Sequence, residues 1–468
     1  METLQRTANR GSVSTGYDID NSLKLEDDNE EGMVKNFTGD GDQRTWTYST
    51  WIKRTELGGD AHHLFGASYS TIQFMSNDLL RVALYDGSNT RYADLDRVFR
   101  DTSAWYHIIV VLDSTQSTAA DRVKIYINGV RDTNFDNNTY TNMSQNDEFG
   151  FGSASANYQF GYNFVGGAND RRFNGYVAET HYVNGTALDE TSFGEFDDNG
   201  IWIPKEYTGS HGTKGFYFKF DDSSNLGKDS SSGGVGDFTL TNITAADQAT
   251  DTPTNNFCTF NPLMTQNNPP TISEGATKST GGGGTWNQTW GNMGVKNGKW
   301  YYEFKVTNTS STGYFGASTT PAEGSDTTGA SLMYNTSFML GQASRIDYYY
   351  WQNGSQVSNE STGWGTISTN DIIGIALDLD SSTKKFIVYK NGSALNGSGT
   401  DLPTNMQDEF IFPLYVQYEN RADEVNFGGY TISSISSAAS DGNGHGTFEI
   451  APPSGYLAIC TKNISETG

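Results

Sequence analysis

The sequence predicts an all-β fold of two jelly-roll-type sandwich domains, and three observations lead to this prediction. Of the 468 residues, 13% are aromatic, 53 are glycine and only 10 are proline. Aromatic and β-branched side chains suit pleated sheets, while glycine and asparagine supply turns. Short alternating strands separated by Gly, Asn and Asp fill the chain, and helix-period stretches are nearly absent. One helical turn is expected, around Asp189 to Gly194.

Two similar hairpins, one in each half, indicate a shared architecture. The first runs from Ile108 to Val130 and contains IIVVLDST and RVKIYINGV; the second runs from Ile373 to Ser393 and contains IGIALDLDSS and KKFIVYKNGS. Each joins a near-continuous apolar strand, typical of burial on both faces, to an alternating strand that ends in Asn-Gly. The pattern favours two packed sheets with Greek-key or jelly-roll connections. Because unrelated β domains can contain such hairpins, the similarity between the two hairpins indicates a fold and not a function.

Composition divides the chain into five segments. Polar residues without periodicity predict an N-terminal arm at 1–17, followed by a sandwich at 18–211. Residues 212–284 are rich in Gly, Ser, Pro and Asn and include a run of four glycines, so they are predicted to connect two domains. A second sandwich is expected at 285–462 and a C-terminal tail at 463–468.

The charge and the apolar segments exclude several classes of protein. The formal net charge is −25, so no Lys/Arg excess exists to displace the counterions of nucleic acid. The longest apolar stretch, Ile108 to Leu112, is far shorter than the roughly 20 residues that span a bilayer, and the first residues lack the apolar region of a signal peptide. The two cysteines, Cys258 and Cys460, form no disulfide or zinc pattern, which favours synthesis in a reducing cytoplasm.

Several segments resemble known families. The first half resembles a concanavalin A-like (laminin-G-like) jelly roll in TWTYSTWIKR, AWYHIIVVLDST, VKIYINGV and FNGYVAETHYVNGTAL. The second half resembles a SPRY domain in GKWYYEFKV, DIIGIALDLD, KKFIVYKNG, EVNFGG and PPSGYLAI. The order of these modules around DTPTNNFCTFNPL is similar to tail-fibre-like structural proteins of marine tailed phages, particularly cyanophages.

The resemblance implies a virion surface protein, a tail fibre or other appendage that attaches to the host by recognising glycan. Its partners would be other virion proteins and a host glycan or receptor, with a homo-oligomer, commonly a trimer, as the assembly. Such a protein is made in the host cytoplasm and released by lysis, without nucleic-acid binding or membrane insertion. Two alternatives stay open: an architectural virion protein, such as a capsid fibre or tail component, and a glycan depolymerase.

The sequence predicts no enzyme. Retaining glycosidases need two carboxyl groups about 5 Å apart, and the nearest approach here is Glu195 with Asp197, where Gly200 stands at the position of the second glutamate. Asp378 and Asp380 share a strand face without a glutamate to complete the set. Two strand histidines, His107 and His181, are expected to be hydrogen-bonded structural residues.

The resemblance also implies a possible role for calcium, since laminin-G-like modules often bind this ion with loop carboxylates. The candidate loops are GDGDQ and FDDSSNLGKDSSSGG, whose oxygen donors are Asp40, Asp42, Asp221, Asp222, Asn225 and Asp229. The alternative is a set of ordinary Asx turns, because Asp and Asn side chains commonly bond the backbone two residues on.

Aromatic side chains stack on sugar rings, so a glycan site is sought where they gather. The densest stretch is DYYYWQNGS, with Tyr348, Tyr349, Tyr350, Trp351 and Asn353 as the candidate ligand-binding residues. Successive strand residues point to opposite faces, so at most half of the aromatics share one face. The alternative is that they belong to the sheet and core. The polar loop from Asn134 to Gly150 is a second candidate.

Overall fold

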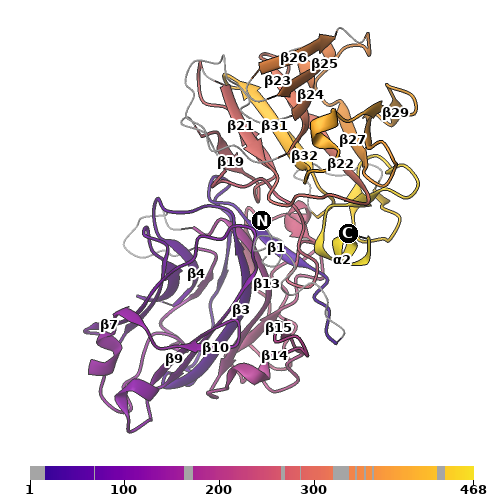
Figure 1. Ribbon diagram of the computed structural model, residues 1–468. Coiled ribbons are helices and arrows are strands. Elements are labelled where there is room, and N and C mark those ends of the chain that lie inside the picture. Colours follow the sequence, from indigo (N-terminus) through magenta and orange to yellow (C-terminus); the bar gives the residue numbers. More distant parts are fainter. Residues whose placement is uncertain are drawn as a thin grey trace. The chain divides into compact units, whose positions relative to one another are not determined.

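The computed structural model describes residues 16–67, 69–162, 172–264, 269–284, 286–319, 337–342, 345–352, 355–360, 363–429 and 438–467. Internal packing divides the chain into two compact units with the boundary between Thr254 and Asn255. We call Val13–Thr254 the N-terminal sandwich and Asn255–Gly468 the C-terminal sandwich. The strands of both units are shown as arrows in Figure 1, from indigo at the N-terminus to yellow at the C-terminus. The all-β prediction is confirmed.

The N-terminal sandwich contains two eight-stranded antiparallel sheets. The first sheet has, in spatial order, β10 (Val130–Asp132), β9 (Val123–Ile127), β8 (Tyr106–Asp113), β3 (Thr45–Arg54), β13 (Gly175–Asn184), β1 (Ser22–Leu25) and β18 (Gln248–Ala249), with β16 (Phe216–Phe218) also on β13. The second sheet has β11 (Phe135–Asn137), β7 (Thr90–Val98), β6 (Leu79–Tyr85), β5 (Ser70–Phe74), β4 (His62–Ala67), β12 (Tyr158–Phe160), β2 (Gly32–Lys35) and β17 (Thr239–Thr241). A separate hairpin joins β14 (Gly194–Phe196) to β15 (Trp202–Pro204).

The C-terminal sandwich also has two sheets. The nine-stranded sheet has β19 (Thr271–Ser273), β20 (Lys278–Thr280), β32 (Ala422–Asn426), β22 (Lys299–Val306), β27 (Ile372–Asp378), β28 (Lys385–Lys390) and β29 (Ser393–Ala394), with β30 (Thr400–Asp401) on β28 and β35 (Leu457–Ala458) on β22. The six-stranded sheet has β21 (Trp286–Trp290), β31 (Phe412–Tyr418), β23 (Gly313–Ser318), β24 (Ser337–Gln342), β25 (Arg345–Gln352) and β26 (Ser355–Glu360). A small hairpin joins β33 (Ala439–Ser440) to β34 (Thr447–Phe448).

Helical structure in the described residues is confined to short segments. The five 3₁₀ turns are η1 (Ala119–Asp121), η2 (Thr139–Asn142), η3 (Glu190–Ser192), η4 (Ala245–Asp247) and η5 (Thr404–Met406). The turn expected around Asp189 to Gly194 is therefore confirmed as η3. The helix α2 (Thr461–Thr467) differs from the prediction, which has the sandwich end at 462 and a tail at 463–468. Within the described residues, none of the helices has the length and apolar character needed to cross a bilayer.

Each core forms between the inward faces of its two sheets. In the N-terminal sandwich, Ile108 and Val110 of β8 pack in one cluster with Phe65 of β4 and Val82 of β6. In the C-terminal sandwich, Phe304 of β22 and its neighbours form the corresponding cluster. Aromatic rings supply much of both cores, which explains how a chain with 35% hydrophobic residues still buries enough apolar surface.

Both predicted hairpins are confirmed, because β8 pairs with β9 and β27 pairs with β28. The Asn-Gly that ends each hairpin then turns the chain into a further short strand. Strands β9 and β10 pair with Ile127 opposite Val130, and the intervening Asn128 and Gly129 have φ values of 49° and 76°. Strands β28 and β29 pair in the same way around Asn391 and Gly392, at 48° and 84°. Positive φ at both central residues matches the right-handed twist of the strands, which is why Asn-Gly selects this turn.

The structure places strands of the predicted connecting region, 212–284, in the sheets of both sandwiches. Strands β16, β17 and β18 of this region pair with β13, β2 and β1 of the N-terminal sandwich. Strands β19 and β20 extend the nine-stranded sheet of the C-terminal sandwich. Strands of two or three residues are too short to show an alternating pattern. The composition of this region, rich in glycine and serine, therefore resembles that of a linker. Backbone pairing decides their place in the sheets.

The beginning of the predicted arm lies outside the described residues. The described part, from Gly16, leads into β1, and the Tyr17 hydroxyl donates to Glu179 Oε1 of β13 at 2.9 Å. Ile19 is buried, and its backbone N–H donates to Thr254 Oγ1 at 3.1 Å. This part of the arm is therefore packed on the N-terminal sandwich.

Candidate functional site

The outward face of the second sheet of the N-terminal sandwich carries a row of polar side chains. Core residues of β5 and β6 alternate with Gln73 and Arg81, so these point away from the core. The register aligns His63, Gln73, Arg81 and Asp94 as successive partners across β4, β5, β6 and β7. Four consecutive strands thus place one polar residue each at the same level of the sheet.

Arg81 and Asp94 form the centre of this row. Arg81 Nε and Nη2 donate to the two carboxylate oxygens of Asp94 at 2.9 and 2.7 Å, and these hydrogen bonds raise the pKa of Arg81. The guanidinium carbon lies 4.5 Å from the centre of the Tyr92 ring. The side chain of Asp94 is 1% exposed and that of Arg81 28%, so Asp94 orients a guanidinium that still reaches solvent.

The neighbouring positions combine small, hydroxyl and aromatic side chains. In the adjacent row, Thr71 lies between Gly66 and Ala83, and its hydroxyl donates to Gln73 Oε1 at 3.2 Å. Tyr85 continues the outward alternation of β6. The ring of Tyr69, which is 55% exposed, meets the Tyr85 ring edge-on with centroids 5.0 Å apart.

His63, Gln73 and Asp94 are buried, so the groups of this face that can meet a polyol are the partly exposed guanidinium of Arg81 and the exposed ring of Tyr69. A guanidinium donates hydrogen bonds to sugar hydroxyls, and an exposed tyrosine ring offers flat apolar surface. Both oxygens of Asp94 are bonded to Arg81, which does not leave this carboxyl poised as a general acid. The arrangement therefore suits binding rather than cleavage.

The aromatic residues predicted for glycan binding are divided between the two faces of β25. Tyr348 packs against the core with its ring 5.7 Å from that of Phe386, and the Tyr350 hydroxyl donates to Asn405 Oδ1 at 2.7 Å. Tyr349 is buried, and Trp351 is partly buried beside it in a separate apolar cluster. Asn353 lies outside the described residues. Tyr350 and Trp351 keep partial exposure, so their role stays a prediction.

The second candidate loop, from Asn134 to Gly150, is tied to the N-terminal core. Tyr140, Met143 and Phe149 of this loop are buried in the core cluster. These apolar anchors limit the part of the loop that could meet a ligand.

The carboxylates predicted to bind calcium accept hydrogen bonds within their own loops. Asp229 accepts from the backbone N–H groups of Tyr217, Ser231 and Gly236 at 2.9–3.0 Å. Asp222 accepts from the Ser224 hydroxyl at 2.6 Å. The bond from Ser231 to Asp229 spans two residues, as in an Asx turn, whereas the bonds from Tyr217 and Gly236 come from more distant residues.

Of the remaining calcium candidates, Asp42 bonds a residue two positions on, whereas Asn225 and Asp40 bond residues farther along the chain. Asn225 donates to Asp237 Oδ2 at 2.8 Å, Asp42 accepts from the backbone N–H of Arg44, and Asp40 accepts from that of Ala154. The side chain of Asp221 is exposed. Within the described residues, no group of three or more His, Cys, Asp or Glu side chains could hold a metal ion.

The carboxylates considered for catalysis have structural contacts. Asp378 accepts from the Ser381 hydroxyl at 2.8 Å, and Asp380 Oδ1 accepts from the Gly298 N–H at 2.7 Å. Asp197 accepts from the N–H groups of Asn199 and Ile201, which closes the turn after β14. These contacts stabilise turns and assign no acid or nucleophile.

His107 and Ser49 form a contact that resembles a nucleophile–base pair but cannot act as one. His107 Nε2 lies 2.8 Å from Ser49 Oγ, while the Trp202 indole N–H donates to His107 Nδ1 at 2.8 Å. Because the indole can only donate, Nδ1 must accept, and the neutral ring carries its proton on Nε2. Burial holds the pKa of His107 well below its usual range. His107 therefore donates to Ser49 and does not take its proton, in agreement with the predicted structural role.

A second buried network surrounds a bulge in β13. The register shifts between Ala178 and His181, where β13 exchanges its neighbour β1 for β16. Glu179 in the bulge has φ 45°. Its Oε1 lies 3.2 Å from His181 Nε2 and accepts from the Tyr217 hydroxyl at 2.6 Å. Burial acts to raise the pKa of Glu179, but these hydrogen bonds outweigh burial and hold it below its ordinary value.

We expect Tyr217→Phe to lower the free energy of unfolding of the N-terminal sandwich by about 1–3 kcal/mol, because a buried carboxylate loses a donor. The control is Tyr207→Phe, whose hydroxyl donates to the carbonyl of Ser210 at the surface. Urea unfolding at neutral pH measures both variants. Equal stability of the two would mean that the Tyr217 hydroxyl does not support the bulge.

Comparison with known proteins finds a family model that is similar to part of the chain. Residues 28–192 match the family model of the concanavalin A-like lectin/glucanases superfamily. This segment contains the whole polar row from His63 to Asp94. The chain matches none of the curated proteins.

Three solved structures are similar to this chain at low TM-scores. The SPRY domain of human HERC1 is 17% identical with a TM-score of 0.27, over 36% of this chain and 96% of that chain. Mouse laminin α1 domains LG4–5 are 8% identical with a TM-score of 0.30, over 95% and 98%. A candidate carbohydrate-binding protein from Bacteroides ovatus is 19% identical with a TM-score of 0.33, over 48% and 58%. Similarities at this level do not assign a function.

Proposed function

We propose that this protein binds glycan through the polar outward face of the second sheet of the N-terminal sandwich, and that it does so as a surface appendage of a tailed phage. The observation that carries the binding proposal is the partly exposed guanidinium of Arg81, oriented by buried Asp94, on the same face of the sheet as the exposed ring of Tyr69. The match of residues 28–192 to a superfamily of lectins and glucanases supports it.

The virion part of the proposal has a separate basis. It rests on the resemblance of the module order, with PTNNFCTFNPL between the two halves, to tail-fibre-like proteins of marine phages. An acidic chain without a nucleic-acid-binding charge pattern suits a protein exposed to solvent on a particle. The expected partners are other copies of the chain, other virion proteins and a host surface glycan.

The binding proposal is tested with an array of bacterial surface polysaccharides and the double variant Arg81→Met/Asp94→Asn. Both charges are changed together, because removing Arg81 alone would leave a buried carboxylate unpaired. We expect the affinity for the bound glycan to fall about tenfold or more, since hydrogen bonds from a charged group each contribute about 1.5–3 kcal/mol.

The matched comparison is Tyr350→Ala/Trp351→Ala in the C-terminal sandwich, with thermal unfolding as the check of folding. Loss of binding in this variant alone would move the site to β25. Unchanged binding in both variants would contradict glycan recognition at either place, and clearing of polysaccharide would indicate a depolymerase. Mass spectrometry of purified phage particles tests the virion part of the proposal independently. Absence of the protein from the particles would contradict this part.

A further inference from the structure

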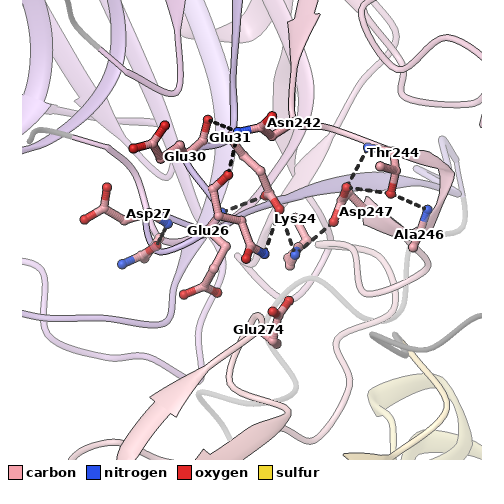
Figure 2. Close-up of polar contacts among 12 residues, drawn as sticks. Lys24, Glu26, Asp27, Glu30, Glu31, Asn242, Thr244, Ala246, Asp247 and Glu274 are labelled. Carbon is pink, nitrogen blue, oxygen red and sulfur yellow. Dashed lines mark hydrogen bonds and ion pairs between the residues drawn. The ribbon is translucent and has the colours of Figure 1, made fainter. Parts of the chain in front are cut away.

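A buried lysine lies between two buried carboxyl groups in the N-terminal sandwich (Figure 2). Lys24 of β1 has its Nζ 2.8 Å from Asp247 Oδ1 and 3.2 Å from Glu31 Oε1. The three side chains are 1%, 6% and 2% exposed, respectively. Glu31 follows the turn between β1 and β2, whereas Asp247 ends η4, directly before β18. The group therefore joins the beginning and the end of the sandwich.

Burial acts against the charged forms of these three side chains. Desolvation makes a buried ion pair expensive, so proton transfer from ammonium to carboxylate is less costly here than in water. Burial raises the pKa of Glu31 to about 7, although Lys24 opposes the shift. Glu31 thus holds a proton in a substantial share of molecules at neutral pH. A neutral amine, a carboxyl group and a proton donor can then coexist within hydrogen-bond reach.

The second oxygen of Asp247 is held by two donors. The backbone N–H of Thr244 lies 2.7 Å from Asp247 Oδ2, and the Thr244 hydroxyl lies 3.1 Å from it. Glu31 is itself positioned, because its Oε2 accepts from the Glu26 N–H at 2.9 Å and its Oε1 from Asn29 at 3.1 Å. Fixed donors at one carboxyl oxygen would stabilise negative charge that develops there during attack on the carbon.

We propose that Lys24 and Asp247 condense to an intramolecular amide crosslink, with Glu31 as the catalytic acid and base. Nζ first passes a proton to Asp247 Oδ1, and its lone pair then forms a bond to Cγ while Oδ2 takes up negative charge beside Thr244. Glu31 donates its proton to Oδ1, the Cγ–Oδ1 bond breaks and water leaves. Glu31 then takes a proton from the nitrogen, which restores its acid form. One water is released, and no oxidant or cofactor is consumed.

The crosslink would close a covalent loop around nearly the whole N-terminal sandwich. It would tie β1 to the segment that enters β18, so the two ends could not separate when the strands open. Closing a long loop lowers the entropy of the unfolded chain, as a disulfide does. The two cysteines of the chain are buried and are not joined by a disulfide, so such a bond would supply a covalent constraint by another route.

The molecule contains a matched comparison. Lys53 Nζ lies 2.7 Å from Asp251 Oδ2, and these side chains are 0% and 1% exposed. Here the other carboxylate oxygen accepts from the Trp105 indole N–H at 3.0 Å. An indole does not exchange protons as a carboxyl group does, so we expect this pair to stay ionic.

The experiment is intact-mass measurement of the full-length protein after denaturation, followed by tryptic peptide mapping. We expect a mass one water below that of the sequence, and a branched peptide that joins Lys24 to Asp247 and is not cleaved after Lys24. Cleavage after Lys53 should be normal. Glu31→Gln should restore the full mass while circular dichroism shows a folded protein, and Asp247→Ala should remove the branched peptide.

The wild-type protein alone is sufficient to overturn the proposal. A full sequence mass after prolonged incubation of the folded protein, together with cleavage after Lys24, would show that no crosslink forms. A mass loss mapped to another peptide would also contradict it. Retention of the crosslink in Glu31→Gln would overturn the catalytic role of Glu31.

Discussion

Replacing Phe65 with alanine is expected to lower the free energy of unfolding of the N-terminal sandwich by about 3–5 kcal/mol. The Phe65 side chain is fully buried between the two sheets. Its ring has centroid distances of 5.1–5.3 Å to the rings of Tyr48, Phe151, Tyr158, Tyr182 and Phe216. Truncation removes buried apolar surface and leaves a cavity that rings from both sheets cannot fill without moving.

Hydrogen exchange on peptides from β3, β4 and β13 measures this loss in the N-terminal sandwich by itself. A probe specific to one unit is needed because a chain of two units does not have to unfold in a single step. The control is Tyr69→Ala, an aromatic truncation at a side chain that is 55% exposed, with an expected change within about 0.5 kcal/mol. Equal effects of the two truncations would contradict a shared aromatic core centred on Phe65.

Replacing Glu303 with glutamine is expected to remove a large part of the pH dependence of stability in the C-terminal sandwich. Glu303 of β22 is 2% exposed. Its Oε1 accepts from Asn426 at 3.0 Å and from the Glu449 N–H at 2.6 Å, while its Oε2 lies 3.3 Å from both the Ile450 nitrogen and the Tyr301 hydroxyl. Burial raises the pKa of Glu303 from 4.5 to about 7, although these hydrogen bonds act in the opposite direction.

The sign of the effect follows from this raised pKa. The folded protein holds the proton of Glu303 more tightly than the unfolded chain does. The contribution of Glu303 to the free energy of unfolding is therefore complete below pH 4.5 and is lost as the pH rises through about 7. Between about pH 4 and about pH 8 the stability of the wild type relative to Glu303→Gln should fall by about 3 kcal/mol. Asp423, with a pKa raised by burial to about 6, adds a smaller change of the same sign to both proteins.

Chemical denaturation across this pH range, monitored by hydrogen exchange of β22 and β32, checks the prediction. Glu409→Gln is the matched control, since this glutamate is exposed. A wild-type-minus-variant difference that does not change with pH would mean that Glu303 titrates normally in the folded protein.

Local sequence was sufficient to predict most individual strands and the tightest turns. The alternation in VKIYINGV places Val123, Ile125 and Ile127 on the core side, and Asn128-Gly129 turns the chain where it was expected. These features depend on neighbours two or three residues apart. Any β domain with this local sequence would form the same turn, because the turn geometry is set by the backbone freedom of asparagine and glycine.

The candidate site was predictable only in part. Gln73 and Arg81 stand at outward positions in STIQF and LLRVALY, but outward polar residues are ordinary in sandwiches and single out no site. Their alignment with Asp94 depends on which strands are neighbours. Conversely, the conspicuous run from Tyr348 to Trp351 is divided between two faces of β25, with Tyr349 buried.

The sequence by itself determined that this chain is a β protein, where its hairpins turn and which residues of each strand face inward, since these properties follow from local alternation and turn chemistry. Only the tertiary structure decided that strands of 212–284 belong to the sheets of both sandwiches. The same is true of the pairing of Arg81 with Asp94 and of Lys24 with Asp247. A period of two specifies the face of a residue but not its neighbour on the next strand. Those neighbours are set by the packing of segments that lie far apart along the chain.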